Sequence, residues 1–110
     1  MTRALATAAP LFAALGDDTR LRILARLSSE GPMSIARLTA EAGTDVSRQA
    51  VTKHLRTLRD AGLVEESRHG RETIWKLEPR RLDDAHRYLD RIAAQWEGAL
   101  ARLKAFAERE

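Results

Sequence analysis

The sequence predicts a mainly α-helical fold that carries one β-hairpin. Apolar residues recur at helical spacing through the first 60 positions, and two strand-like runs, Val64–Arg68 and Glu72–Leu77, flank a glycine-containing turn. A heptad pattern of apolar residues then runs through a predicted helix over residues 80–109. The chain has 110 residues and no internal repeat, so we expect one domain over residues 1–110.

Three short helices are predicted before residue 46. The first covers residues 9–16, with Pro10 in its first turn and Gly16 at its end. The second covers residues 17–29 and is capped by Asp17, and the third covers residues 34–43 and is capped by Ser34. The positions expected to face inward are Leu21, Ile23, Leu24 and Leu27 in the second helix, and Ile35, Leu38 and Ala42 in the third.

A fourth helix is predicted in the stretch SRQAVTKHLRTLRDAGLV, which follows the short turn TDV. Ser47 caps this helix and Gly62 ends it. At 100° per residue, Val51, Leu55 and Leu58 fall on one side of the helix. The polar residues Gln49, Lys53 and Arg56 fall on the opposite side, with Thr52 on the flank.

Two short helices joined by a tight turn, followed by a basic hairpin, make a winged helix-turn-helix. The helix-turn-helix is predicted over residues 34–62, the wing over residues 63–77 and a long C-terminal dimerisation helix over residues 80–109. The turn of the wing is His69-Gly70-Arg71, and Ile74 and Trp75 are expected to anchor the hairpin to the core.

Positive charge is concentrated in the middle of the chain. Residues 47–81 hold nine basic and five acidic side chains, whereas residues 1–46 hold five of each and residues 82–110 hold five basic and six acidic. A basic face suits a polyanionic partner, because each neutralised phosphate releases counterions. Charge alone is equally consistent with an arginine-rich surface that meets only water.

The predicted helix and wing together offer the chemistry that duplex DNA requires. Gln49 can pair with adenine, Lys53 can donate to guanine, and Thr52 can offer its hydroxyl or its methyl group to thymine. Helix flanks and the hairpin tip suit phosphates or the minor groove, whereas His54 is expected to pack inside. The predicted DNA-binding residues are Ser47, Arg48, Gln49, Thr52, Lys53, Arg56, Arg68, His69 and Arg71.

The last predicted helix carries an apolar seam with alternating spacings of three and four residues. The seam consists of Leu82, Ala85, Leu89, Ile92, Trp96, Ala99, Leu103 and Phe106. A chain this small has too little remaining core to cover a seam of this length, which favours a homodimer. The alternative is that the seam packs within its own domain. A second function class follows from the same seam, namely a winged-helix module that binds another protein through this helix.

Composition argues against several other classes. The chain has no cysteine, and it contains no G-x-S-x-G, P-loop or H-E-x-x-H motif, so we expect neither an enzyme nor a cofactor. No apolar run approaches the length of a membrane span, and the first residues lack the apolar core of a secretory signal, so we expect no membrane association and a cytoplasmic location.

Several stretches together resemble the ArsR/SmtB family of bacterial winged-helix repressors. They are LFAALGDDTRLRILARL, SIARLTAEAG with VSRQAVTKHLRTLRDAGLV, and RHGRETIWKL, which span about residues 10–78. The resemblance implies repression of transcription at an inverted-repeat operator in double-stranded DNA. It also implies a homodimer built from the first and last helices, which adds Leu11 and Phe12 to the expected interface.

The resemblance is to the branch of the family that lacks the metal-binding cysteines, because SIARLTAEA contains none. A second metal site in the family lies on the last helix, where this chain offers Asp84, His86 and Glu97 but has Leu100 at the remaining position. Three ligands could hold a metal weakly across a dimer, and the alternative is that these are surface charges of the helix. We therefore expect no metal site, and no residue pattern identifies an inducer.

Overall fold

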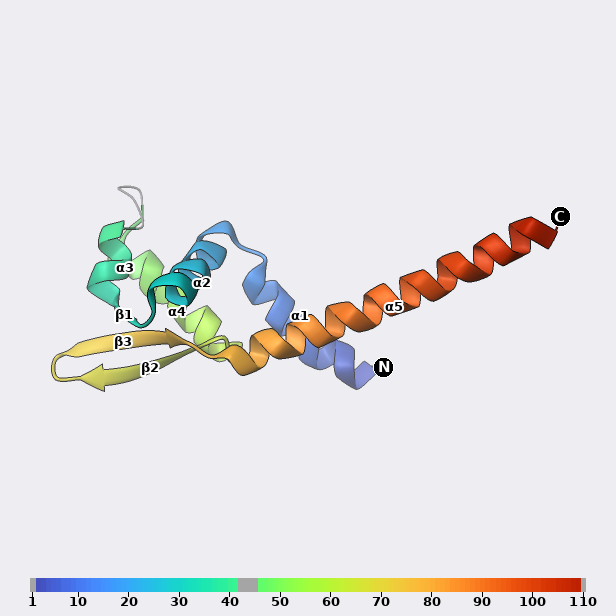
Figure 1. The fold of residues 1–110 in the computed structure, drawn as a ribbon. Helices are drawn as coiled ribbons and strands as arrows, with labels where there is room; N and C mark the ends of the chain where they lie inside the picture. The colour runs from blue at the N-terminus through green and yellow to red at the C-terminus, as the bar shows by residue number, and fades with distance from the viewer. Residues whose placement is uncertain (1, 42–45, 110) are drawn as a thin grey trace.

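The computed structural model describes residues 2–41 and 46–109, which form five helices and a three-stranded antiparallel sheet (Figure 1). The elements are α1 (Thr2–Leu15), α2 (Asp18–Glu30), β1 (Met33–Ser34), α3 (Ile35–Glu41), α4 (Arg48–Asp60), β2 (Val64–His69), β3 (Glu72–Leu77) and α5 (Pro79–Arg109). The predicted fold class, mainly helical with a wing and a long last helix, is confirmed.

Helix α4 contributes three leucine and valine side chains to the centre of the core. Val51, Leu55 and Leu58 are completely buried, as their helical spacing predicts. The Ser47 hydroxyl caps the helix by accepting a hydrogen bond of 3.1 Å from the Ala50 backbone N–H. The helix ends at Asp60, and Gly62, two residues later, has a φ of 79°, which is readily adopted only by a residue without a side chain.

The wing is a tight hairpin with Gly70 and Arg71 in its turn. Strands β2 and β3 pair from Val64 opposite Leu77 to His69 opposite Glu72. Gly70 has a φ of 66°, which suits the first central position of a two-residue hairpin turn. Trp75 is buried and Ile74 is half-buried, so the hairpin is anchored to the core as expected.

The sequence reasoning missed the third strand. Strand β1 has two residues, and Met33 and Ser34 lie opposite Trp75 and Ile74 of β3. The sheet order is therefore β1-β3-β2, which attaches the inner strand of the wing to the segment between α2 and α3.

The prediction for the inner face of α2 was wrong at one position. Leu21 is half exposed, whereas Ile23, Leu24 and Leu27 are buried as predicted. The inward positions are 20, 23, 24 and 27, which follow the spacing of one helix face, and Arg20 occupies the first of them. Leu21 is rotated by 100° from Arg20 and meets water.

Two further helix predictions need correction or fall outside the described residues. Helix α1 begins at Thr2, so Pro10 lies inside the helix and not in its first turn. In α3, Leu38 is buried and Ser34 caps the helix by accepting a hydrogen bond from the Arg37 N–H. The predictions for Ala42, Gly43 and the turn at residues 44 and 45 lie outside the described residues.

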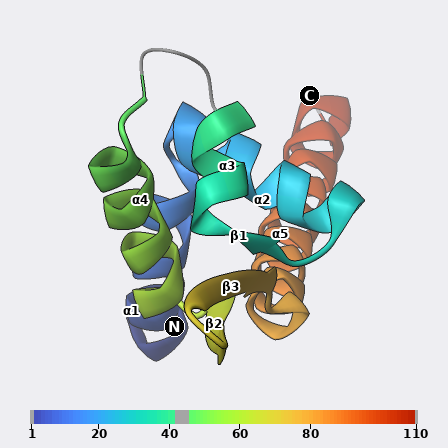
Figure 2. The same ribbon diagram turned by 90° about the vertical axis from the view of Figure 1, so that its left-hand side faces the viewer.

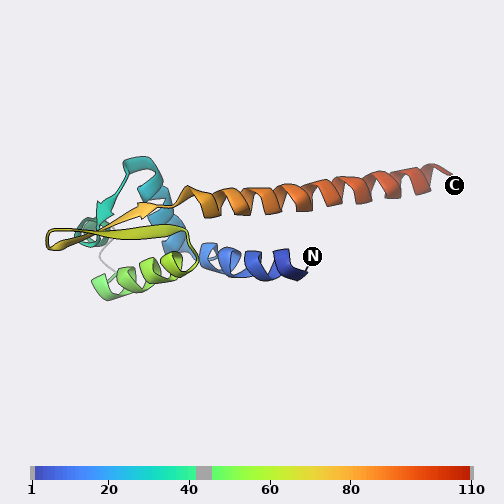
Figure 3. The same cartoon turned by 90° about the horizontal axis from the view of Figure 1, so that it is seen from below.

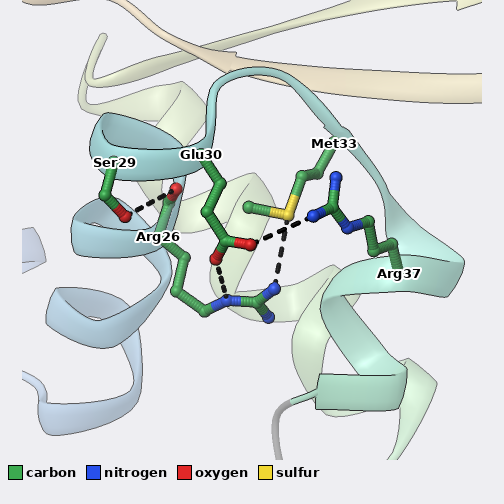
Figure 4. Close-up of polar contacts among 5 residues, drawn as sticks. All are labelled: Arg26, Ser29, Glu30, Met33 and Arg37. Carbon is green, nitrogen blue, oxygen red and sulfur yellow. Dashed lines mark hydrogen bonds and ion pairs between the residues drawn. The ribbon is translucent and has the colours of Figure 1, made fainter.

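Polar contacts hold α2, β1 and α3 together on one side of the domain (Figure 4). The Glu30 carboxylate accepts hydrogen bonds from Arg26 and from Arg37, each at 3.0 Å. Arg26 also donates to the sulfur of Met33 at 3.5 Å. These contacts fix α3, which lies between α2 and α4 when the molecule is seen end-on (Figure 2).

The molecule is elongated, measuring 69 × 28 × 22 Å, because most of α5 extends beyond the rest of the domain (Figure 1). Only the first part of α5 packs against α1, where the rings of Phe12 and Tyr88 lie 5.7 Å apart. Among the described helices, none is long and apolar enough to cross a membrane.

Candidate nucleic-acid interface

The face of α4 that points away from the core carries the predicted DNA-binding residues. Arg48, Gln49, Lys53 and Arg56 are exposed, as is the capping residue Ser47. The helix begins with backbone N–H groups that have no partner inside the helix, and its dipole favours an anion at that end. The first two turns of α4 therefore combine hydrogen-bonding side chains with a positively polarised helix terminus.

Thr52 is the one predicted contact on α4 that is only half exposed. Its hydroxyl donates a hydrogen bond of 2.8 Å to the backbone carbonyl of Arg48, one turn earlier. A shallow hollow of about 370 Å³ opens beside it, lined by Thr52 with Arg48, Gln49 and Arg56. With the hydroxyl engaged by the backbone, the methyl group is the part of Thr52 that remains for an outside contact.

The tip of the wing carries the remaining predicted contacts. Arg68, His69 and Arg71 are exposed at the closed end of the hairpin, beside the Gly70 turn. The His69 Nε2 lies 3.2 Å from the Ser67 hydroxyl, which fixes the imidazole along the strand. Figure 3 shows the N-terminal end of α4 and the hairpin tip at the same end of the molecule, with α5 directed toward the other end.

The nine basic residues of the segment 47–81 divide into two groups. Five of them make no ion pair with another described residue: Arg48, Lys53, Arg56, Arg68 and Arg71. Four have carboxylate partners: Arg59 with Glu66 at 2.6 Å, Lys76 with Glu65, Arg80 with Glu78, and Arg81 with Asp84. The hydrogen bond to Glu66 raises the pKa of Arg59. All five of the first group lie on the outer face of α4 or at the wing tip.

His54 belongs to the interior side of α4, as expected. Its Nδ1 lies 3.3 Å from a terminal nitrogen of Arg20 and 3.8 Å from the Asp17 carboxylate. It therefore contacts the junction of α1 and α2 and not the exposed face.

The expected dimer interface is only partly available at the surface. Leu11 and Ala85 are already buried in the core of the protomer, so little of either side chain remains for a partner to cover. Phe12, Leu82 and Ile92 are half-buried, and Ala99 is exposed. The large exposed apolar side chains of α5 are Leu89 at 52 %, Trp96 at 63 %, Leu100 at 54 %, Leu103 at 64 % and Phe106 at 63 %.

Leu100 was missed by the heptad reasoning, although its position carried a signal. It lies four residues after Trp96 and three before Leu103, which places it at the edge of the same helix face. The exposed apolar face is therefore wider than a seam built from two positions in every seven residues. We call the residues Leu89, Trp96, Leu100, Leu103 and Phe106 the α5 stripe.

The three weak candidates for a metal site are not brought together in the chain. The Asp84 carboxylate accepts a hydrogen bond of 3.1 Å from Arg81, and His86 lies 3.5 Å from the Asp90 carboxylate. Glu97 lies eleven residues after His86 on the same helix, which is about 16 Å along the axis. Over residues 2–41 and 46–109, no group of three or more potential ligands could hold a metal ion.

Comparison with known proteins agrees with this geometry. A family model described as a helix-turn-helix domain matches residues 15–67. The solved structure of an ArsR-like transcriptional regulator from Rhodococcus sp. RHA1 is 40% identical, covers 93% of each chain and superposes with a TM-score of 0.80.

Two curated proteins extend the comparison. The uncharacterised HTH-type transcriptional regulator YuzN of Bacillus subtilis (strain 168) is 43% identical over 68 residues, which are 58% of this chain and 74% of YuzN. The arsenical resistance operon repressor of Escherichia coli (strain K12) is 33% identical over 69 residues, which are 63% of this chain and 57% of that repressor. Proteins of this kind regulate transcription by binding DNA and are not enzymes. The chain belongs to the ArsR family of winged helix-turn-helix transcriptional regulators.

Proposed function

We propose that the protein acts as a homodimer that binds an inverted-repeat operator and represses transcription, in the cytoplasm where the chromosome of a bacterium lies. The observation that carries the DNA contact is the division of its basic residues. Within residues 47–81, the basic residues without a carboxylate partner among the described residues lie on the outer face of α4 and at the wing tip. An arginine or lysine without a partner can neutralise a phosphate without first breaking an ion pair.

In this proposal α4 is the recognition helix and lies in the major groove, which is wide enough for one helix. Gln49, Thr52 and Lys53 contact base edges, while Ser47, Arg48 and Arg56 contact phosphates on either side. The wing tip, with Arg68, His69 and Arg71, contacts the backbone or the minor groove beside it.

The homodimer is supported by the α5 stripe. Five large apolar side chains stay more than half exposed along about 26 Å of one helix face, from Leu89 to Phe106. An apolar face of this extent is unusual on a protein that stays a monomer. The heptad spacing favours another helix as its cover, and a second copy offers the same face.

Repression is supported by the E. coli relative, which is named a repressor. A protein bound across a promoter excludes other proteins from the same DNA, and this applies to its own promoter as to any other. We extend the proposal to autoregulation on that basis.

The proposal is tested by selecting the DNA fragments that the protein binds from a random pool. The protein is then footprinted on the selected fragment and on the DNA upstream of its own gene. We expect an inverted repeat with half-sites about one or two helical turns apart, near 34 Å per turn. The affinity should fall steeply as salt increases. Binding that ignores both sequence and salt would reject the proposal, and would favour a module that binds another protein through α5.

A further inference from the structure

The orientation of α4 within the domain is fixed by more than the apolar core. Its buried residues, Val51, Leu55 and Leu58, contribute contacts that are strong but not directional. Hydrogen bonds, in contrast, restrict both a distance and an angle. Two arginine side chains, one on α2 and one on α5, make such directional contacts with the inner side and the end of α4.

The first contact involves Arg20 and links the end of α1 to the middle of α4. The Arg20 Nε donates to the carbonyl of Ala14 at 2.6 Å, and a terminal nitrogen donates to the carbonyl of Ala13 at 3.2 Å. These carbonyls belong to the last turn of α1, and that of Ala13 also accepts a hydrogen bond of 3.3 Å from the Gly16 backbone N–H. The other terminal nitrogen lies 3.3 Å from Nδ1 of His54. One guanidinium therefore bridges α1 and α4.

The second contact involves Arg81 and links the start of α5 to the end of α4. The Arg81 Nε donates to the carbonyl of Ala61 at 3.2 Å, directly after the last residue of α4. The stem of Arg81 lies against Gly62, where an added Cβ atom would be only 2.8 Å from the Arg81 Cγ. Asp84, one turn further along α5, accepts a hydrogen bond of 3.1 Å from the same guanidinium and holds it in place.

The hollow beside Arg81 does not suggest a ligand site instead. It measures about 690 Å³ and is bounded by the end of α4, the start of β2 and the start of α5. Its charged side chains are already paired across it, including Arg59 with Glu66 at 2.6 Å and Arg80 with Glu78 at 3.5 Å. Its contacts connect the three elements to one another.

We infer that Arg20 and Arg81 are positioning residues that set the spacing at which the dimer accepts its two half-sites. The inference rests on the proposed function. His54 and Ala61 are seven residues apart, or about 10 Å along α4. A rigid helix attached at two separated points cannot swing about either of them. Since α1 and α5 are the helices expected at the dimer interface, the two arginines relate each recognition helix to the twofold axis.

The experiment compares the full-length protein with the variants Arg20→Met and Arg81→Met, which keep an apolar stem but remove the guanidinium. The matched controls are Arg22→Met and Arg80→Met, which remove an equal charge from the same helices. Among the described residues, Arg22 pairs only with Asp18 and Arg80 only with Glu78, and the side chains of Arg22 and Arg80 are 73% and 91% exposed. Each protein is titrated with a series of inverted repeats whose half-sites are identical and whose spacer lengthens by one base pair from one repeat to the next.

We expect the wild-type protein and both controls to prefer one spacing by about tenfold or more over spacings one base pair away. Each added base pair moves a half-site by about 3.4 Å and turns it by about 35°. In Arg20→Met and Arg81→Met this preference should shrink to about twofold, because a recognition helix that can change its orientation can reach a half-site at more than one spacing. The dimer dissociation constant and the salt dependence of binding to unrelated DNA should stay at wild-type values.

The outcomes separate this inference from the function on which it rests. If the wild-type protein shows no preference for any inverted repeat, the proposed function fails, and the inference fails with it. If the wild-type preference is clear but both arginine variants keep it while remaining folded, the inference alone is overturned. Equal loss in the controls would also overturn it, because charge and not position would then be the cause. Should Arg20→Met not fold, Arg81→Met and Arg81→Lys still decide the question, since lysine keeps the charge without the planar fork.

Discussion

Removal of Trp96 provides the sharpest test of the proposed dimer. Trp96 lies in the middle of the α5 stripe, and 63% of it is exposed in the protomer. A tryptophan side chain can bury about 250 Å², so about 160 Å² of it stays open to water in a single chain. The substitution Trp96→Ala therefore removes apolar surface that only a partner would cover.

The expected magnitude follows from that area. At about 25 cal/mol per Å², covering between half and all of the open surface stabilises the dimer by about 2–4 kcal/mol per protomer. A twofold axis brings the residue to the interface twice. The total of about 4–8 kcal/mol corresponds to a dimer dissociation constant raised by at least about a thousandfold.

The measurement is sedimentation equilibrium over a series of protein concentrations. The control is Glu97→Ala, which changes the neighbouring exposed residue outside the α5 stripe and should leave the dissociation constant unchanged. Because Trp96 is largely exposed in the protomer, the variant should keep its helix content, as circular dichroism would show. In the wild-type protein, dilution should shift the tryptophan emission to longer wavelength, since Trp75 is already buried and only Trp96 changes environment.

A Trp96→Ala protein that remains as dimeric as the wild type would refute the assignment of the interface to this face. Equal weakening by Glu97→Ala would refute it as well, because the effect would then not depend on the apolar surface.

Three further predictions concern DNA contacts and acid stability. Replacing thymine by deoxyuridine at one half-site position should weaken DNA binding by the wild type and by Thr52→Val about fourfold, since a buried methyl group contributes about 0.8 kcal/mol. Thr52→Ser lacks the methyl group of threonine, so its binding should not change. Competition binding measures this, and weaker binding of the deoxyuridine DNA by Thr52→Ser would contradict it. Gln49→Ala should cost about 1–3 kcal/mol of binding free energy and relax the preference at one base pair. Arg71→Ala should instead weaken binding to all sequences and reduce the slope of log affinity against log salt by about one. Titrations on single-base operator variants at several salt concentrations distinguish the two. The backbone N–H of Arg20, which donates to the Asp17 carboxylate, lowers the pKa of Asp17. The folded state therefore favours the ionised carboxylate, and this contribution to stability is complete above the unfolded pKa and is lost as the pH falls through the folded pKa. Asp17→Asn keeps a capping side chain but does not titrate, so its melting temperature should fall less than that of the wild type below about pH 4; an equal fall would contradict the assignment.

Local signals in the sequence predicted the elements that we propose contact DNA. A capping serine before an apolar period predicted where α4 begins, and Gly62 predicted where it ends, because both depend on a few neighbouring residues. The hairpin was predicted for the same reason, since a glycine between two strand-like runs favours a tight turn. The polar outer face of α4 followed from its period alone.

Pairings between distant residues could not be predicted in this way. Strand β1 exists because Met33 and Ser34 lie beside β3, about 40 residues later, and a run of two residues has no period of its own. Leu21 was expected inside because it is apolar. The inner face of α2 instead includes Arg20, whose guanidinium contacts the carbonyls at the end of α1.

The sequence by itself determined the fold class, the family and the positions of α4, the wing and the heptad pattern of α5, because each rests on local spacing or on motifs. Only the tertiary structure decided which of the nine basic residues in the segment 47–81 are paired with carboxylates, and which part of the heptad seam is covered by the protomer itself. Leu11 and Ala85 are buried there, while the α5 stripe is open. The physical reason is the same in each case, since a side chain's partners are set by residues that the fold brings near it.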